Sequence, residues 1–153
     1  MSRAERAKEY FLQGYACSQA VALAFTDVMG MNAETICKIM LPFGGGLGRL
    51  RMTCGAVSGM AAVVGMVFSS GENSPENKKD TYAIVQELCG QFKAETGSLV
   101  CAELLAGMKV PVQVGGEAEA RTAEYYKKRS CGDMVALAAQ ILEDYLREKG
   151  KLS

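Results

Sequence analysis

The sequence has no histidine and no tryptophan, and only three of its 153 residues are prolines. Without histidine, the chain lacks the commonest general base and the usual partner of a catalytic cysteine or serine. Zinc sites that combine cysteine with histidine are excluded, and so is covalent haem, because its CxxCH attachment motif needs histidine. Any metal site must therefore be built from thiolates, with or without carboxylates.

The chain also lacks an excess of charge and a long apolar run. Seventeen Lys and Arg residues balance seventeen Asp and Glu residues, so no overall field attracts nucleic acid, and we expect no nucleic-acid partner. The uncharged run 54–68 contains three glycines and is shorter than the roughly 20 residues of a membrane span. We expect a buried helix there and no membrane insertion. The charged first residues do not resemble a signal peptide, so we expect a cytoplasmic protein.

The main pattern in the sequence is helical periodicity of its apolar residues. Apolar residues recur at helical spacing along most of the chain, and β-branched alternation is confined to 110–114. This pattern predicts an all-α fold, with residues 1–153 forming one domain, a bundle of about seven to eight helices. The strongly polar segment 117–128 is expected to be a helix with a solvated face. The expected helices are 2–13, 17–30, 33–41, 53–69, 75–96, 98–105, 117–128 and 131–149.

Four of the six cysteines fall at the starts of expected helices. Unpaired backbone N–H groups and the positive end of the helix dipole favour a thiolate at such positions, even without histidine. We therefore expect reactive or metal-ligating sulfur at Cys17, Cys54, Cys101 and Cys131. Thr53 and Ser98 are the expected caps of the helices that carry the second and third of these. Cys37 and Cys89 lie in helix interiors and are expected to be core residues. A structural role for all six stays open, because free cysteine is among the most buried residue types.

The helix order predicts where these sulfurs lie. If successive helices run antiparallel, the four helices that begin with cysteine all start at the same end of the bundle. We therefore expect the four thiols to converge. Their separations of 37, 47 and 30 residues match no zinc ribbon, CxxC motif or ferredoxin pattern.

Two glycine-rich features accompany Cys54. Gly55 and Gly59 leave one face of the helix 53–69 almost bare, so either a neighbouring helix packs closely there, or a cofactor or second cysteine helix reaches the Cys54 sulfur. The glycines of the loop 44–48 indicate a turn with positive φ. Alternatively, the loop binds an anion through its backbone N–H groups together with Arg49 and Arg51. It lacks the Lys-Ser/Thr ending of a P-loop. Gly55, Gly59 and Arg49 are therefore candidate cofactor-binding residues.

The segment 54–59, Cys-Gly-Ala-Val-Ser-Gly, preceded by the glycine-rich 42–49, resembles the motif of the C-GCAxxG-C-C family of redox-active proteins. The family has one cysteine before this motif and two after it, which here correspond to Cys17, Cys101 and Cys131. The resemblance covers nearly the whole chain. It implies a prokaryotic protein, because members occur in bacteria and archaea, often near transporter genes. A related domain in split-Soret cytochromes implies electron transfer or an iron–sulfur cluster.

Three hypotheses follow. The first is a thiol-based redox protein, a thiol oxidoreductase if it is an enzyme, whose cysteines cycle between dithiol and disulfide with a redox partner protein. The second is a four-thiolate site for an iron–sulfur cluster or zinc, formed by Cys17, Cys54, Cys101 and Cys131, for electron transfer or sensing. The third is a non-catalytic helical binding module, with a homo-oligomer left open.

Overall fold

The computed structural model describes residues 1–152, and Ser153, the last residue of the expected domain, lies outside the described residues. Within that range the regular structure is helical apart from one isolated bridge between Thr53 and Val100, so the all-α prediction is confirmed. The helical segments, of which α3 and α5 are single turns, are α1 (Arg3–Leu12), α2 (Cys17–Leu23), α3 (Thr26–Met29), α4 (Ala33–Met40), the 3-10 turn η1 (Leu41–Phe43), α5 (Gly44–Leu47), α6 (Gly55–Phe68), α7 (Pro75–Thr96), α8 (Cys101–Gly107), α9 (Ala123–Lys128) and α10 (Cys131–Glu148).

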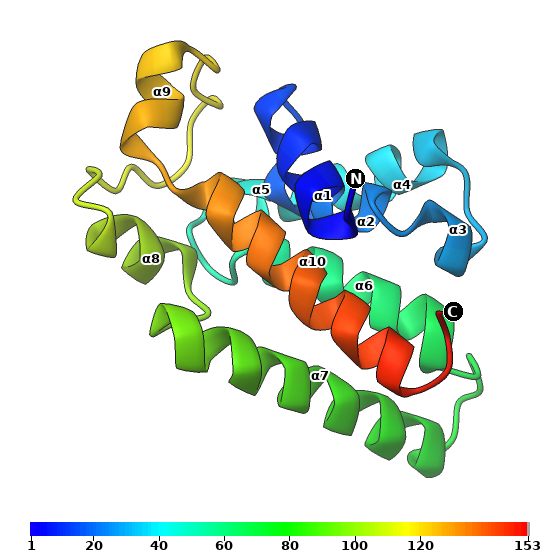
Figure 1. Cartoon of the computed structure of the whole chain (residues 1–153). Coiled ribbons are helices and arrows are strands. Elements are labelled where there is room, and N and C mark those ends of the chain that lie inside the picture. Colours follow the sequence, from blue (N-terminus) through cyan, green and yellow to red (C-terminus); the bar gives the residue numbers. More distant parts are fainter. Residues whose placement is uncertain (153) are drawn as a thin grey trace.

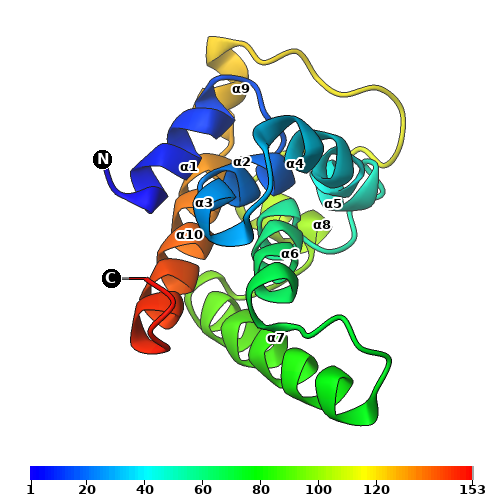
Figure 2. The ribbon, with the colours of Figure 1, turned by 90° about the vertical axis from the view of Figure 1, so that its right-hand side faces the viewer.

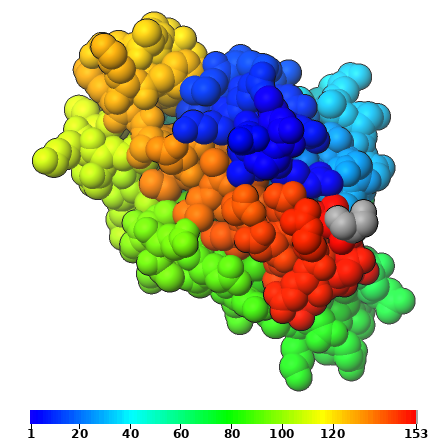
Figure 3. All heavy atoms as spheres, viewed as in Figure 1, coloured from blue at the N-terminus to red at the C-terminus, as the bar shows by residue number. Residues whose placement is uncertain are grey.

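Helices α6 and α10 form the centre of the molecule. No charged residue occurs in α6, which packs against α2, α7 and α10. One face of α10 is apolar and buried, and this helix contacts α1, α2, α6 and α7 (Figure 1). Figure 2 shows α7 and α9 at opposite ends of the molecule. On the surface in Figure 3, α1 lies directly against α10.

Side-chain caps fix several helix starts. Ser2, Asn32, Ser74 and Thr122 each accept a hydrogen bond from the backbone N–H three residues further on. Each such cap is worth about 1 kcal/mol. The expected helices 33–41 and 75–96 begin where the structure begins α4 and α7, and Gly97 ends α7 in the left-handed conformation.

Two expected helices are shorter in the structure. The helix expected over 17–30 breaks at Phe25, whose φ of −127° and ψ of 24° are not helical. The break buries the Phe25 ring completely and lets Asp27, in α3, pair with Arg3 at 2.8 Å. The helix expected over 117–128 is helical only in α9, because residues 117–121 have no regular structure and Thr122 caps the helix that follows.

The expected caps Thr53 and Ser98 are also wrong. Cys54 itself is the N-cap of α6, and Val100 is that of α8. The reason is tertiary: an antiparallel bridge joins Thr53 to Val100, and both helices begin only after this pairing.

The glycine-rich segment 44–48 contains one irregular turn, α5. Gly45, Gly46 and Gly48 have φ values of 64°, 73° and 55°, so the expectation of positive φ is confirmed. Among residues 1–152, no helix is both long and apolar enough to cross a bilayer.

Candidate functional site

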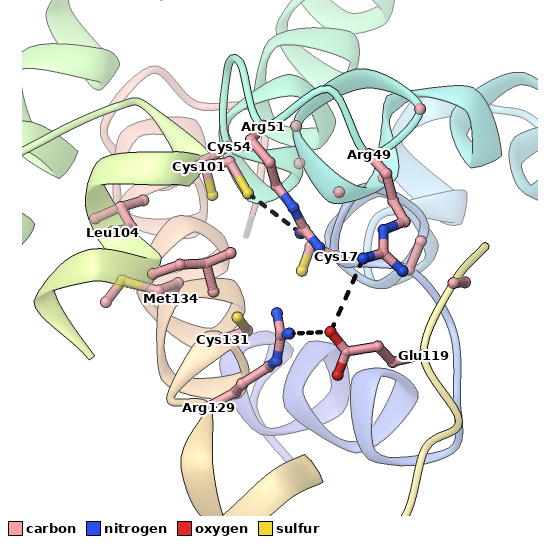
Figure 4. A pocket seen from close by; sticks show the side chains of 18 of the residues that line it. Cys17, Arg49, Arg51, Cys54, Cys101, Leu104, Glu119, Arg129, Cys131 and Met134 are labelled. Atoms are coloured by element: carbon pink, nitrogen blue, oxygen red, sulfur yellow. Dashed lines mark hydrogen bonds and ion pairs between the residues drawn. The ribbon is translucent and has the colours of Figure 1, made fainter. Parts of the chain in front are cut away.

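A cavity of about 340 Å³ lies where α2, α6, α8 and α10 begin. Its lining includes Cys17, Cys54, Cys101 and Cys131, and Figure 4 shows their sulfur atoms directed into it. The predicted convergence of the four helix starts is therefore confirmed. Cys37 and Cys89 do not line this cavity and pack, partly buried, against the hydrophobic core.

Backbone pairing holds Cys54 and Cys101 on neighbouring segments. The Cys54 N–H donates to the Leu99 carbonyl at 2.8 Å, and the Cys101 N–H donates to the carbonyl of Met52. The backbone of Gly46 closes in from the other side, because a Cβ at this position would lie 2.6 Å from the Cβ of Cys101. Two cysteines 47 residues apart in sequence thus reach one wall of the cavity.

The bare glycine face of α6 is covered by α2. A Cβ on Gly59 would lie 2.7 Å from the Ser18 carbonyl oxygen, and one on Gly55 would lie 3.1 Å from the Cβ of Cys17. The sequence left two interpretations of this face open, a closely packed helix or a second cysteine helix that reaches Cys54. Both apply, because the close neighbour is α2 and this helix begins with Cys17. Gly55 lines the cavity together with Arg49, whereas Gly59 is packed behind it against α2.

Cys131 and Cys17 form an interacting pair of thiols. Hydrogen bonding with Cys17 lowers the pKa of the Cys131 thiol to about 7, and the charges of Arg129, Arg121 and Arg51 act in the same direction, against the effect of burial. The same hydrogen bond raises the pKa of the Cys17 thiol well above its ordinary value, and burial adds to this. The pair therefore favours a Cys131 thiolate that accepts a hydrogen bond from the Cys17 thiol.

Cys54 behaves differently from the expectation for a helix start. Burial raises the pKa of its thiol to about 11, although the N–H groups of Ala56 and Val57 act to lower it. The side chain is only 7% exposed, so desolvation outweighs the helix terminus. The expectation of a lowered thiol pKa is thus wrong for Cys54 and Cys17. The pKa of Cys131 is lowered, but Cys17 and three arginines lower it rather than the helix start.

Arginines dominate the charge of the cavity. Arg49 and Arg51 reach it from the end of the glycine-rich segment, where both have left-handed backbone, with φ of 64° and 61°. Arg129 is paired with Glu119 at 2.6 Å, and Arg49 lies 3.9 Å from the same carboxylate (Figure 4). Arg121 donates to the carbonyls of Phe11 and Tyr15. The lining therefore holds four arginines and one glutamate.

The segment before α10 was missed as part of the site. The sequence indicated a solvated face for 117–128, yet Glu119, Arg121 and Tyr125 line the cavity. Arg121 and Arg129 also stack on the Tyr125 ring, at 5.0 and 4.7 Å from its centroid. Basic and aromatic residues immediately before a candidate reactive cysteine were the signal that could have found them.

The thiols do not fit a metal site in this arrangement. Among residues 1–152, no group of three or more cysteine, aspartate or glutamate side chains is placed to hold a metal ion. A guanidinium nitrogen of Arg51 lies 3.8 Å from the Cys101 sulfur, so a positive group already occupies the space beside it. A four-thiolate zinc or iron–sulfur site needs its sulfurs around one centre.

Comparison with known families agrees with this geometry. The family model described as "Putative redox-active protein (C_GCAxxG_C_C)" matches residues 15–145. The chain belongs to this family. The matched C_GCAxxG_C_C region contains all four cysteines of the cavity and both arginine-bearing segments. Searches of curated proteins and of solved structures gave no match.

Proposed function

We propose that this domain of the C_GCAxxG_C_C family is a thiol–disulfide oxidoreductase in which Cys131 and Cys17 cycle between dithiol and disulfide. The observation that carries the proposal is that Cys131 and Cys17, at the starts of α10 and α2, direct their sulfurs into the same arginine-lined cavity. A thiolate that sits beside a second thiol is the arrangement that disulfide exchange requires.

The exchange proceeds in two steps. The Cys131 thiolate attacks one sulfur of a substrate disulfide, forms a mixed disulfide and releases the other half of the substrate as a thiolate. Cys17 then loses its proton to that leaving thiolate and attacks the Cys131 sulfur, which closes the Cys17–Cys131 disulfide and releases the second half. The substrate gains two electrons and the protein loses two. A redox partner protein with a dithiol returns the domain to its reduced form.

The environment assigns the order of attack. Arg129 precedes Cys131 by two residues and helps to lower the pKa of the Cys131 thiol. Cys17 holds its proton more tightly, so it acts second, when the mixed disulfide has removed the Cys131 charge. Cys54 stays protonated at neutral pH and takes no part in the first step. Six free cysteines suit a reducing compartment, and the proposal therefore places the protein in the cytoplasm.

Trapping the mixed disulfide tests the proposal. Anaerobically purified protein is treated with hydroxyethyl disulfide, and the adducts are located by peptide mass spectrometry. Wild type is expected to form a Cys17–Cys131 disulfide, and the Cys17→Ser variant to retain the reagent on Cys131. Cys89 lies outside the cavity, so the Cys89→Ser variant should form the Cys17–Cys131 disulfide as wild type does.

Two results would overturn this function. One is a wild-type protein that keeps both thiols unmodified in excess disulfide while exposed control thiols react. The other is stoichiometric iron with acid-labile sulfide, or zinc, that is lost when any of the four cavity cysteines is replaced by serine, because the thiols would then be ligands.

A further inference from the structure

Arg51 is a buried cation without a carboxylate partner. The residue is 8% exposed, its Nε donates to the Gln113 carbonyl at 3.0 Å, and one terminal nitrogen lies 3.8 Å from the Cys101 sulfur. Among residues 1–152, no Asp or Glu oxygen lies within 4.0 Å of its guanidinium. Burial of a guanidinium is unfavourable unless an anion pairs with it. Among the described residues no carboxylate supplies this anion, and the charge nearest in kind is the Cys131 thiolate.

The negative charges of the lining do not balance its arginines. Its single carboxylate, Glu119, already contacts Arg129 and Arg49. The buried Nε of Arg49 also has no hydrogen-bond acceptor in the part of the chain that the structure describes. The lining therefore keeps an excess of three positive charges, or two when Cys131 is ionised. This excess indicates that the occupant of the cavity is an anion.

The volume of the cavity and its apolar wall restrict which anions can occupy it. A volume of about 340 Å³ lies at the lower end of the range for small-molecule sites. Leu104, Leu105 and Met134 give the cavity an apolar wall facing the arginines, as Figure 4 shows for Leu104 and Met134. The occupant thus combines an anionic group with an uncharged remainder.

We infer that the cavity binds a low-molecular-weight disulfide that carries a carboxylate, with the carboxylate on the Arg51 guanidinium and the disulfide at Cys131. A planar guanidinium pairs with a carboxylate through two parallel hydrogen bonds, which fixes orientation as well as charge. The inference rests on the proposed function and names its substrate. The electron balance is that of the exchange described above, with the small disulfide as oxidant and two small thiols as products.

The test compares two probes of opposite character on the same thiols. One is 5,5′-dithiobis(2-nitrobenzoate), a disulfide with two carboxylates, and the other is 4,4′-dithiodipyridine, which is neutral at pH 7.5. Stopped-flow experiments give the rate constant of Cys131 with each probe. The rate constant for the anionic probe is divided by that for the neutral probe. This value is then divided by the same quotient measured for 2-mercaptoethanol, which corrects for the intrinsic reactivity of the probes. This ratio cancels changes in thiolate population, because the same Cys131 thiolate attacks both probes.

We expect the ratio to exceed ten in wild type, to fall at least tenfold in Arg51→Gln, and to recover in part in Arg51→Lys, which restores the charge without the planar fork. Arg147→Gln, on the exposed face of α10, should keep the wild-type ratio. As a check that needs no variant, 4-nitrobenzoate should slow alkylation of wild-type Cys131 saturably.

The outcomes separate the two proposals. The inference of an anionic substrate is overturned if the wild-type ratio is near one, Arg51→Gln does not change it, and 4-nitrobenzoate gives no protection. The proposed thiol exchange would still stand in that case. Absence of reaction at Cys131 with both probes overturns the exchange itself. If Arg51→Gln does not fold, the protection experiment decides alone.

Discussion

Gly46 and Cys101 touch so closely that no side chain fits between them. A Cβ on Gly46 would lie 2.6 Å from the Cys101 Cβ and 2.6 Å from the backbone nitrogen of Met52. The glycine also has a φ of 73°, which other residues rarely adopt. The position of a candidate redox cysteine thus depends on the absence of a side chain 55 residues earlier in the chain.

We expect Gly46→Ala to lower the free energy of unfolding by about 2 to 4 kcal/mol, because the clash with backbone adds to the left-handed strain. Gly48→Ala is the matched control, since it has φ of 55° but no neighbour within 4 Å, and it should cost only about 1 kcal/mol. Urea unfolding followed by circular dichroism measures both. Equal losses in the two variants would show that strain, not the contact with Cys101, limits position 46.

Alkylation of Cys131 should follow a titration near neutral pH. The pKa of its thiol is about 7, below the ordinary 9.0, so the thiolate disappears only as the pH falls through 7. The iodoacetamide rate at Cys131 should therefore be half-maximal near pH 7, as read by quantitative peptide mass spectrometry. In Cys17→Ala the midpoint should move upward, since the hydrogen bond from Cys17 is the largest cause of the shift. An unchanged midpoint would show that Cys17 does not lower the pKa of the Cys131 thiol.

Glu119 should oppose the Cys131 thiolate. Its carboxylate lies 2.6 Å from Arg129 and offsets a charge that lowers the pKa of the Cys131 thiol. Glu119→Gln should therefore shift the alkylation midpoint to lower pH and raise the rate at pH 6 about twofold. Glu124→Gln, whose carboxylate pairs with Lys128 on α9 away from the cavity, provides the control. A shift to higher pH would mean that Glu119 instead positions Arg129 beside the sulfur.

The ion pair of Arg3 and Asp27 gives the fold an acid-sensitive contact. Hydrogen bonds from the Arg3 guanidinium lower the pKa of the Asp27 carboxyl to about 2 from the ordinary 3.8. The depressed pKa means that the stabilisation is present above about pH 4 and is lost as the pH falls through 2. Because the carboxylate side chain is 63% exposed, solvent screening limits the contribution to less than about 1 kcal/mol. Asp27→Asn should flatten the pH dependence of thermal unfolding between pH 2 and 4, whereas Asp80→Asn should not.

Local signals in the sequence were enough for most helix ends and for the convergence of the thiols. Asn32 and Ser74 mark helix starts through their own side chains, and Cys17, Cys101 and Cys131 each begin a helix. The convergence follows from those starts and the alternating direction of helices.

What the sequence could not supply depends on contacts between distant segments. The extended pairing around Thr53 and Val100 replaces two expected caps, and it exists only because the two strands of chain meet in the fold. The role of Arg121 and Arg129 was hidden for the same reason, since a polar segment reads as solvated until its neighbours are known. Phe25 broke a helix because burial of its ring outweighed helical continuity.

The left-handed backbone of Arg49 and Arg51 has a consequence for laboratory evolution. A non-glycine residue in this region costs about 1 to 3 kcal/mol, so the two arginines oppose stability at the positions where they aim charge into the cavity. A screen for heat resistance alone would drift toward glycine or asparagine at these sites and would lose the cation that faces the thiols. Selection on a thiol-dependent growth phenotype would hold the arginines in place, and the sequences that survive each regime would separate the demands of folding from those of chemistry.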